Sequence, residues 1–372
     1  MSTVSTVSAA DASDNSVVDV IESELQADLL PEPRRSPLPP PRDLLNEFPS
    51  SEQSRRVTQE TRKAIRRILR REDRRMVVVV GPCSIHDTEA ALEYAARLKE
   101  LQAKLSERLL LVMRTYLEKP RTTVGWRGLV NDPHLDGSYD MAEGLRRSRH
   151  LLAQITDTGL PVATEVLDIA VPSYIGDLVS FAAVGARTTE SQPHRALASG
   201  LAMPVGFKNG TDGSIQTALD AMVSARESHS YLGITDDGGC CVLQTPGNAD
   251  TMLILRGGKA SGPNYGWVSI FSAEAKLERL GVRPSLMVDC SHANSDYNPA
   301  RQATVLESVA KSRQQGSQSL MGVMIESHLF PGKQKLTPGG EGLQYGVSVT
   351  DGCIGWDETV SLLERLHTAL AD

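Results

Sequence analysis

The chain has 372 residues, of which 40 % are hydrophobic and 23 % are charged, as in ordinary globular proteins of one or two domains. Its formal net charge of −7 argues against nucleic acid as a main partner. No apolar run approaches the roughly 18 residues that cross a bilayer, and the N-terminus lacks the basic-then-apolar pattern of an export signal. We therefore expect a globular protein without nucleic-acid or membrane partners.

Residues 1–50 differ in composition from the rest of the chain. They contain nine acidic and three basic residues, runs of Ser, Thr and Ala, and a proline cluster around Pro39. A segment of this kind buries too little apolar surface to offset the entropy lost on ordering. The sequence predicts a disordered acidic, proline-rich arm over 1–50 and a single catalytic domain over 51–372.

Residues 52–75 are rich in Arg, and Ile65, Ile68 and Leu69 repeat at helical spacing. One interpretation is a nucleic-acid patch. The other is an amphipathic helix that caps the bottom of the domain, and it is favoured because the run also holds Glu60 and Glu72 and has no interleaved aromatic residues.

From residue 76 onward, short apolar runs alternate with helical patterns. The runs are 76–80, 109–113, 161–164, 182–186, 203–207, 252–255, 286–288 and 320–325; helical patterns include 88–105, 139–155, 214–225, 299–312 and 358–369. Buried apolar strands separated by helices indicate a parallel sheet, and eight of them predict a closed (β/α)8 barrel. Residues 233–245, with Asp237-Gly238 at the turn, are predicted as an inserted β-hairpin.

A polar group follows every predicted strand on the same side. In chain order these are Cys83, Arg114, Glu165, Arg187, Lys208, Arg256, Asp289 with His292, and Glu326. In a (β/α)8 barrel these positions converge on the C-terminal mouth, where active sites are built. A single charge at a strand end is usually a solvated terminus, but a series of eight predicts a functional site.

The cations expected at this mouth indicate the charge of its ligand. They are Arg114, Lys119, Arg121, Arg187, Lys208 and Arg256. So many cations repel one another unless anions share the cavity, and guanidinium forks match phosphate and carboxylate. We expect two phosphorylated substrates, or a phosphate together with a carboxylate.

A metal ion is a second expectation. Cys83, His292, Glu326 and Asp351 offer one sulfur, one nitrogen and two carboxylates, a set that suits one divalent ion such as Mn, Fe, Co or Zn. The alternative is that Cys83 is a packed thiol and His292 a hydrogen-bonded loop residue. The residues alone leave both open, because no short metal motif links the four. The five cysteines suggest no disulfide framework, which favours a reducing cytoplasm.

Several segments resemble the type I 3-deoxy-D-arabino-heptulosonate 7-phosphate (DAHP) synthases. They are GPCSIHD at 81–87, MRTYLEKPRTTVGW at 113–126, GARTTES at 185–191, PVGFKNGTDG at 204–213, LRGGK at 255–259, DCSHANS at 289–295 and GVMIESH at 322–328. The resemblance runs from about residue 55 to the C-terminus. It implies condensation of phosphoenolpyruvate with D-erythrose 4-phosphate and water, the first step towards chorismate and the aromatic amino acids.

The resemblance also implies roles for individual residues. It assigns the metal to Cys83, His292, Glu326 and Asp351, phosphoenolpyruvate to Arg114, Lys119, Arg187, Lys208 and Arg256 with Glu165 beside it, and the phosphate of erythrose 4-phosphate to Arg121 and Thr122. Lys119 is the candidate for proton delivery to the new alkoxide. Together with the metal ligands Asp351 and His292, it makes up the expected catalytic set.

Feedback inhibition by an aromatic amino acid is common in this family, in a cleft between subunits. By segment match the effector would contact Asp168, Pro172, Ser173, Leu197, Leu201 and Tyr231, which could equally be ordinary core and turn residues. The resemblance further implies a homodimer or homotetramer.

Two alternatives remain. A 3-deoxy-D-manno-octulosonate 8-phosphate synthase would use arabinose 5-phosphate on the same barrel, but its relatives carry Lys-Ala-Asn-Arg-Ser where this chain has Lys119-Pro-Arg-Thr122. A non-catalytic regulatory homologue would lack catalytic residues, and none of the expected residues is missing.

Overall fold

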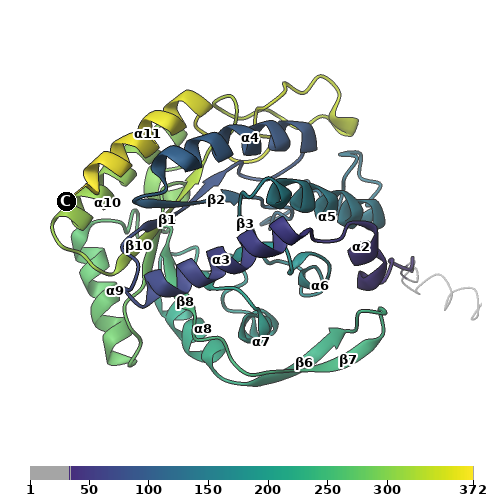
Figure 1. Ribbon diagram of the computed structural model, residues 1–372, viewed down its shortest axis with the longest axis horizontal. Coiled ribbons are helices and arrows are strands. Elements are labelled where there is room, and N and C mark those ends of the chain that lie inside the picture. Colours follow the sequence, from purple (N-terminus) through teal and green to yellow (C-terminus); the bar gives the residue numbers. More distant parts are fainter. Residues whose placement is uncertain (1–32, 34, 372) are drawn as a thin grey trace, which may run out of the picture. The chain divides into compact units, whose positions relative to one another are not determined.

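Eight parallel strands close into a barrel (Figure 1) in the order β1-β10-β9-β8-β5-β4-β3-β2. The strands are β1 (Met76–Gly81), β2 (Leu109–Arg114), β3 (Val162–Glu165), β4 (Val179–Val184), β5 (Val205–Lys208), β8 (Thr251–Leu255), β9 (Leu286–Asp289) and β10 (Leu320–Glu326). This computed structural model describes residue 33 and residues 35–371. All eight strands are buried along their full length, which explains their continuous apolar sequences.

Helices surround the barrel. They are α2 (Pro41–Glu47), α3 (Glu52–Leu69), α4 (Thr88–Leu105), α5 (Met141–Asp157), α6 (Pro172–Ile175), α7 (Gln192–Gly200), α8 (Gln216–Arg226), α9 (Trp267–Arg279), α10 (Gln302–Gln314) and α11 (Trp356–Ala369). Their starts follow ordinary capping chemistry: the Asp87 carboxylate accepts from the backbone N–H groups of Glu89 and Ala90 at the first turn of α4. Within the described chain, no helix has the length and apolar character needed to cross a membrane.

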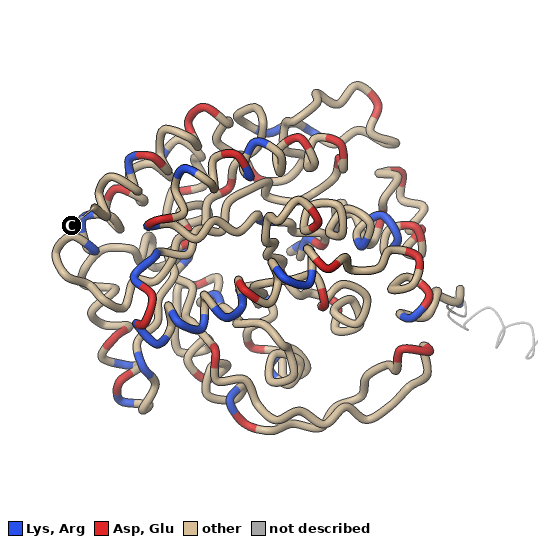
Figure 2. The backbone as a smooth tube through the Cα atoms, viewed as in Figure 1, with Lys and Arg blue, Asp and Glu red and all other residues tan. Residues whose placement is uncertain are grey.

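Helix α3 closes the end of the barrel where the strands begin. Ile65 and Ile68 belong to the apolar cluster that fills the barrel interior. Arg62 on the same helix donates to the carbonyls of Gly176 and Val179 at the start of β4, and Arg66 pairs with Asp250 just before β8 at 2.5 Å. The interpretation of the basic run as a capping amphipathic helix is confirmed, and Figure 2 shows Lys and Arg positions, in blue, spaced along the backbone of α3.

The (β/α)8 barrel with an inserted hairpin is confirmed. Among the barrel strands the largest displacement is in β4, which is predicted at 182–186 and lies at Val179–Val184, and the hairpin begins at His229 rather than at residue 233. The hairpin consists of β6 (His229–Ile234) and β7 (Cys240–Thr245), paired antiparallel. Its turn contains Asp237-Gly238 as predicted, with Gly238 at φ 81°.

The chain is ordered earlier than the predicted boundary at residue 50. Helix α2 begins at Pro41, a residue suited to the first helical position, and Leu44 is completely buried. The buried Arg149 guanidinium donates to the carbonyls of Leu44 and Phe48 at 3.1 and 2.9 Å. Residues 41–50 are therefore part of the folded unit that begins at Pro39. Residues 1–32 and 34 lie outside the described residues, and the arm stays a prediction for them.

Candidate active site

The carboxyl ends of the strands surround a cavity of about 410 Å³. Every residue predicted to bind substrate lines it: Arg114, Lys119, Arg121, Thr122, Glu165, Arg187, Lys208 and Arg256, together with His292 and Asp351. Parallel strands in register bring these residues together, because Arg114, Glu165 and Lys208 are the last residues of β2, β3 and β5.

Arg114 is completely buried at the floor of this cavity. Its guanidinium donates to Glu326 Oε1 at 3.0 Å, to the Cys83 carbonyl at 3.1 Å and to the Pro82 carbonyl at 3.1 Å. The charge lies 3.5 Å from the centre of the Tyr116 ring. Burial opposes the charged form, but Tyr116 and Glu326 outweigh it and raise the pKa of Arg114. The floor is thus a fixed cation with a preset orientation.

Lys208 is the second buried cation. Its Nζ lies 3.2 Å from Asp289 Oδ2 and 3.8 Å from Glu165 Oε2. Asp289 also lies 3.0 Å from His292 Nδ1. Burial disfavours its charge, yet His292 and Lys208 hold the pKa of Asp289 well below its usual range. Glu165 Oε1 is buried without a hydrogen-bond partner among the described residues, so an acceptor faces this region ready for a ligand donor.

Three of the four predicted metal ligands lie together. The Cys83 sulfur and one carboxylate oxygen each from Glu326 and Asp351 are all within 4.8 Å of one another. His292 lies beside them, with Nε2 3.9 Å from Glu326 Oε1. Burial, reinforced by Glu326, raises the pKa of the Cys83 thiol to about 11. A thiol, two carboxylates and an adjacent imidazole fit a divalent transition metal, whose binding would displace the thiol proton.

Lys119 occupies the space between the proposed ligands. Its Nζ lies 2.8 Å from the Cys83 sulfur and 3.1 Å from Asp351 Oδ2. Burial opposes the ammonium charge, but Cys83 and Asp351 outweigh burial and raise the pKa of Lys119. Lys119 in turn lowers the pKa of Asp351. The amine therefore carries its proton at neutral pH, directly beside the three-residue cluster.

Comparison with known proteins places this geometry in a family. Residues 49–364 match the DAHP synthetase I family. The chain belongs to the DAHP synthetase I family. It is 52 % identical over 330 residues to the Tyr-sensitive phospho-2-dehydro-3-deoxyheptonate aldolase of Escherichia coli, covering 89 % of this chain and 92 % of the relative.

A second E. coli relative, the Phe-sensitive enzyme of the same name, is 49 % identical over 331 residues, covering 89 % of this chain and 94 % of the relative. Among solved structures, the phospho-2-dehydro-3-deoxyheptonate aldolase of Francisella tularensis superposes with a TM-score of 0.89 at 44 % identity, covering 91 % of this chain and 98 % of that one. Membership of the DAHP synthetase I family and the barrel fold are thus supported by sequence and structure alike.

The rim of the cavity in this DAHP synthetase I family member is more open than its floor. Arg121, Thr122 and Arg187 are exposed, and Arg187 Nη2 donates to Thr122 Oγ1 at 2.9 Å. A second cavity of about 560 Å³ adjoins this rim and shares Lys119, Arg121 and Arg187 with the first. The mouth therefore offers buried cations below and exposed cations above.

Sequence reasoning missed a buried trio of amides. Asn209 Oδ1 accepts from the Arg256 N–H at 2.8 Å and from Asn264 Nδ2 at 3.1 Å. Asn294 Oδ1 accepts from the Asn264 N–H at 2.8 Å. These bonds tie the loops after β5, β8 and β9 together and fix the backbone of Arg256. Asn209 and Asn294 fall inside quoted segments and Asn264 lies between two of them, but asparagine is common in loops, so only the fold reveals the network.

The residues predicted for an effector lie around different parts of a single chain. Leu197, Leu201 and Tyr231 belong to or pack against the main apolar cluster, on α7 and β6. Pro172 and Leu201 line a small apolar space of about 10 Å³. Asp168 instead lines the second cavity at the rim, and its N–H donates to the buried Glu118 carboxylate at 3.3 Å. Ser173 lies in the short helix α6.

Proposed function

We propose that the cavity at the strand ends carries out the DAHP synthase reaction with the residues assigned below. As a 3-deoxy-7-phosphoheptulonate synthase, the chain condenses phosphoenolpyruvate with D-erythrose 4-phosphate and water, and releases phosphate. The observation that carries the residue assignment is the presence, in one cavity, of paired buried cations beside a Cys/Glu/Asp cluster.

Phosphoenolpyruvate is assigned to the deeper cations. Arg114, Lys208 and Arg256 are buried, and Arg187 extends this set at the rim. The phosphate and carboxylate of this small substrate, which together carry two to three negative charges, would balance the charges of these cations. Because Arg114 and Lys208 are already held by carboxylates, little side-chain ordering remains to be done on binding.

Erythrose 4-phosphate is assigned to the outer part of the cavity. Arg121 and Thr122 offer a guanidinium and a hydroxyl for its phosphate, and the Arg187–Thr122 bond orients that hydroxyl. With the phosphate at the rim, the aldehyde would point inward towards Lys119 and Asp351. The two substrates would then meet with the reacting carbons between the floor and the rim.

One divalent metal ion, of the class Mn, Fe, Co or Zn, would be held by Cys83, His292, Glu326 and Asp351. When bound, it supplies Lewis-acid polarisation of the aldehyde oxygen. Asp289 and Ser291 would orient His292, because both lie within 3.0 Å of His292 Nδ1 and leave Nε2 facing Glu326.

Lys119 is the proposed proton donor. The C3 carbon of phosphoenolpyruvate attacks the aldehyde carbon, and the aldehyde oxygen becomes an alkoxide that takes a proton. Water then adds at C2, and phosphate leaves with cleavage of the C–O bond. Lys119 Nζ is the protonated group nearest the Cys83 and Asp351 side chains, so it lies where that alkoxide would form.

Regulation and assembly follow the family. Relatives named Tyr-sensitive and Phe-sensitive support inhibition of this chain by an aromatic amino acid, with Asp168, Pro172, Ser173, Leu197, Leu201 and Tyr231 completed by a second subunit of a homodimer or homotetramer. A reducing cytoplasm is the proposed compartment, since all five cysteines are free thiols.

The test is a turnover assay with metal-reconstituted protein. Erythrose 4-phosphate and arabinose 5-phosphate are compared as co-substrates of phosphoenolpyruvate, each with and without a chelator and with Phe, Tyr or Trp. We expect turnover with the four-carbon sugar only, abolished by chelation and restored by metal. Turnover with arabinose 5-phosphate, or turnover that survives complete metal removal, would contradict the proposal. Absence of any turnover despite bound metal would favour the regulatory homologue.

A further inference from the structure

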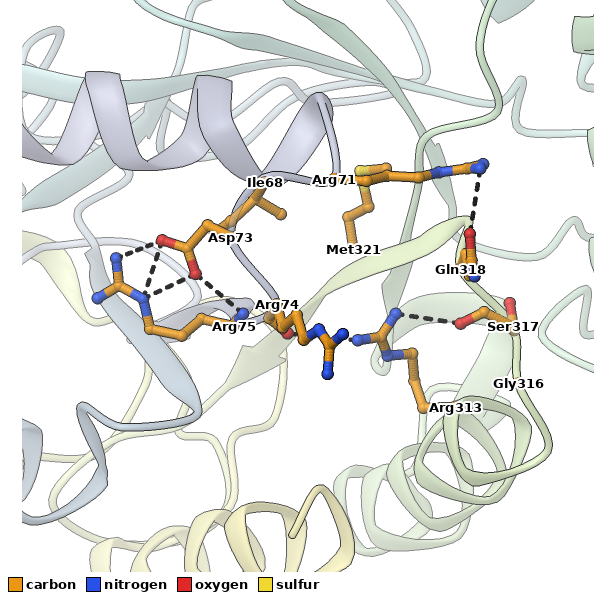
Figure 3. Close-up of a pocket in the computed structure, with 10 residues that line it drawn as sticks. All are labelled: Ile68, Arg71, Asp73, Arg74, Arg75, Arg313, Gly316, Ser317, Gln318 and Met321. Atoms are coloured by element: carbon orange, nitrogen blue, oxygen red, sulfur yellow. Dashed lines mark hydrogen bonds and ion pairs between the residues drawn. The ribbon is translucent and has the colours of Figure 1, made fainter. Parts of the chain in front are cut away.

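Another charged cavity, the bottom cavity, lies at the end of the barrel opposite the mouth (Figure 3). It has a volume of about 330 Å³ and is lined by Ile68, Arg71, Asp73, Arg74, Arg75, Arg313, Gly316, Ser317, Gln318 and Met321. These residues come from the C-terminal end of α3, the loop before β1, the end of α10, the loop before β10 and the start of β10. None of them belongs to the site described above.

Three of its four arginines lack an acidic partner among the described residues. Arg75 is paired with Asp73, whose Oδ2 lies 2.6 Å from Arg75 Nη2. Arg71, Arg74 and Arg313 make no ion pair with any described residue. A surplus of three positive charges around so small a space attracts an anion.

The Arg313 guanidinium is held over the cavity by neutral acceptors. Nη1 donates to the Ser317 carbonyl at 3.0 Å and Nη2 to the Arg74 carbonyl at 3.3 Å. Burial lowers the pKa of Arg313, which shows that its charge is partly desolvated without compensation. Figure 3 shows the Arg74 and Arg313 guanidinium groups next to each other. Two planar forks in this arrangement are suited to one phosphate.

Arg71 stands where glycine is usually favoured. Helix α3 ends with the Glu72 N–H donating to the Arg67 carbonyl and the Arg71 N–H to the Ile68 carbonyl, the two bonds of a Schellman cap. The residue at this position adopts the left-handed conformation, and Arg71 has φ 63°. A side chain there strains the backbone, because its Cβ lies too close to the following carbonyl oxygen. Arg71 reaches the cavity and donates to Gln318 Oε1 at 3.3 Å.

We propose that this cavity is a binding site for a small phosphorylated ligand, held by Arg71, Arg74 and Arg313. The volume suits a phosphate group with a small organic part rather than a duplex. The cavity has no aromatic side chain on which a nucleic-acid base could stack. Guanidinium pairs bind phosphate through several charge-assisted hydrogen bonds, and the local surplus of charge contrasts with the net charge of −7 for the whole chain.

The test is equilibrium dialysis of labelled inorganic phosphate against the metal-loaded holoenzyme. The residues proposed to bind substrate at the mouth are the same in the wild type and in both variants, so phosphate bound there is common to all three proteins and the difference between them reports on the bottom cavity. The binding variant is Arg74→Gln/Arg313→Gln. The matched control is Arg301→Gln/Arg365→Gln, which removes the same charge from two exposed arginines paired with Asp296 and Glu307. We expect the wild type to bind one phosphate per chain at the bottom cavity, with affinity reduced at least about tenfold in the binding variant and less than about twofold in the control.

Equal weakening in both double variants would overturn the proposal, because it would mean that only net charge matters. The absence of phosphate binding in the wild type would also overturn it. The same holds if a short oligonucleotide displaces phosphate and binds both variants with equal affinity. Turnover of each variant without added phosphate reports on the mouth independently. This inference rests on the chain being a synthase only for its turnover readout. If the synthase assignment is wrong, the wild type shows no turnover. If only the phosphate site is wrong, turnover of the wild type is intact.

Discussion

The cations at the two ends of the barrel differ in their burial and in their partners. At the mouth, Arg114, Lys119 and Lys208 are buried, and each lies within 3.2 Å of a carboxylate oxygen. At the bottom, Arg74 and Arg313 are more exposed, and the Arg313 guanidinium donates to the backbone carbonyls of Arg74 and Ser317. A buried cation requires a permanent partner, so the mouth keeps its geometry without a ligand. The bottom cavity depends on solvent or an anion to balance its charge.

The largest expected effect comes from removing one cation at the mouth. Lys119→Met leaves Cys83 and Asp351 without their shared ammonium group and removes the proposed proton donor. We expect turnover to fall at least about 10³-fold, while the metal content of the purified protein is retained. Steady-state turnover and metal analysis measure the two quantities separately.

Lys311→Met is the matched change at the bottom end, because Lys311 is an exposed residue in the last turn of α10. It should keep turnover within about twofold of the wild type, as expected for an exposed charge with little influence on the mouth. Appreciable turnover of Lys119→Met would remove Lys119 from its proposed role. A comparable loss in Lys311→Met would mean that the two ends are coupled.

The second-largest effect concerns Glu118, a carboxyl group at the mouth that forms no ion pair with a described residue. Glu118 is buried, and burial raises its pKa to about 8. The unfolded chain loses this proton near pH 4.5, whereas the folded chain keeps it until about pH 8. The contribution of Glu118 to the free energy of unfolding is therefore complete below pH 4.5. It is lost as the pH rises to 8, at up to about 1.4 kcal/mol per pH unit. Urea unfolding at pH 5, 6.5 and 8 should show wild-type stability falling relative to Glu118→Gln.

Asp73 provides the opposite case at the bottom. Burial raises its pKa, but pairing with Arg75 outweighs burial and lowers it. Its contribution is present above pH 3.8 and lost only at lower pH, so the effect of Asp73→Asn should be the same at pH 5 and pH 8. A Glu118→Gln effect that is equally independent of pH would show that Glu118 is ionised in the folded state.

Much of the site could be predicted because strand ends in a parallel barrel must converge. Arg114, Glu165 and Lys208 were placed correctly from the order of the strands alone, although β4 was displaced by three residues at its start. The position of Arg187 was insensitive to that displacement, because it lies in the loop beyond β4. The roles of individual ligands depended on family resemblance, since no local spacing links Cys83 to Asp351.

What the sequence could not reveal depends on contacts between distant segments. Helix α2 was predicted to be disordered, because its composition is polar and proline-rich. It is held by Arg149, about a hundred residues away, whose guanidinium also binds Asp177 Oδ1 at 2.7 Å. Asp289 was recognised only as a strand end, whereas its pairing with Lys208 and His292 required coordinates.

The smallest expected effect is a gain of stability at the bottom. Arg71→Gly places glycine in the left-handed position that ends α3, and we expect it to raise the free energy of unfolding by about 1 kcal/mol. Arg70→Gly is the matched control one residue earlier, where φ is −87° and glycine has no strain to relieve. It should lower stability by up to about 1 kcal/mol.

If Arg71→Gly is stabilising and also weakens phosphate binding, an unfavourable backbone conformation is retained at the site of the ligand, as strained residues often are. A destabilising Arg71→Gly would mean that the side chain supports the cap itself, and the contrast between a self-sufficient mouth and a ligand-dependent bottom would no longer hold.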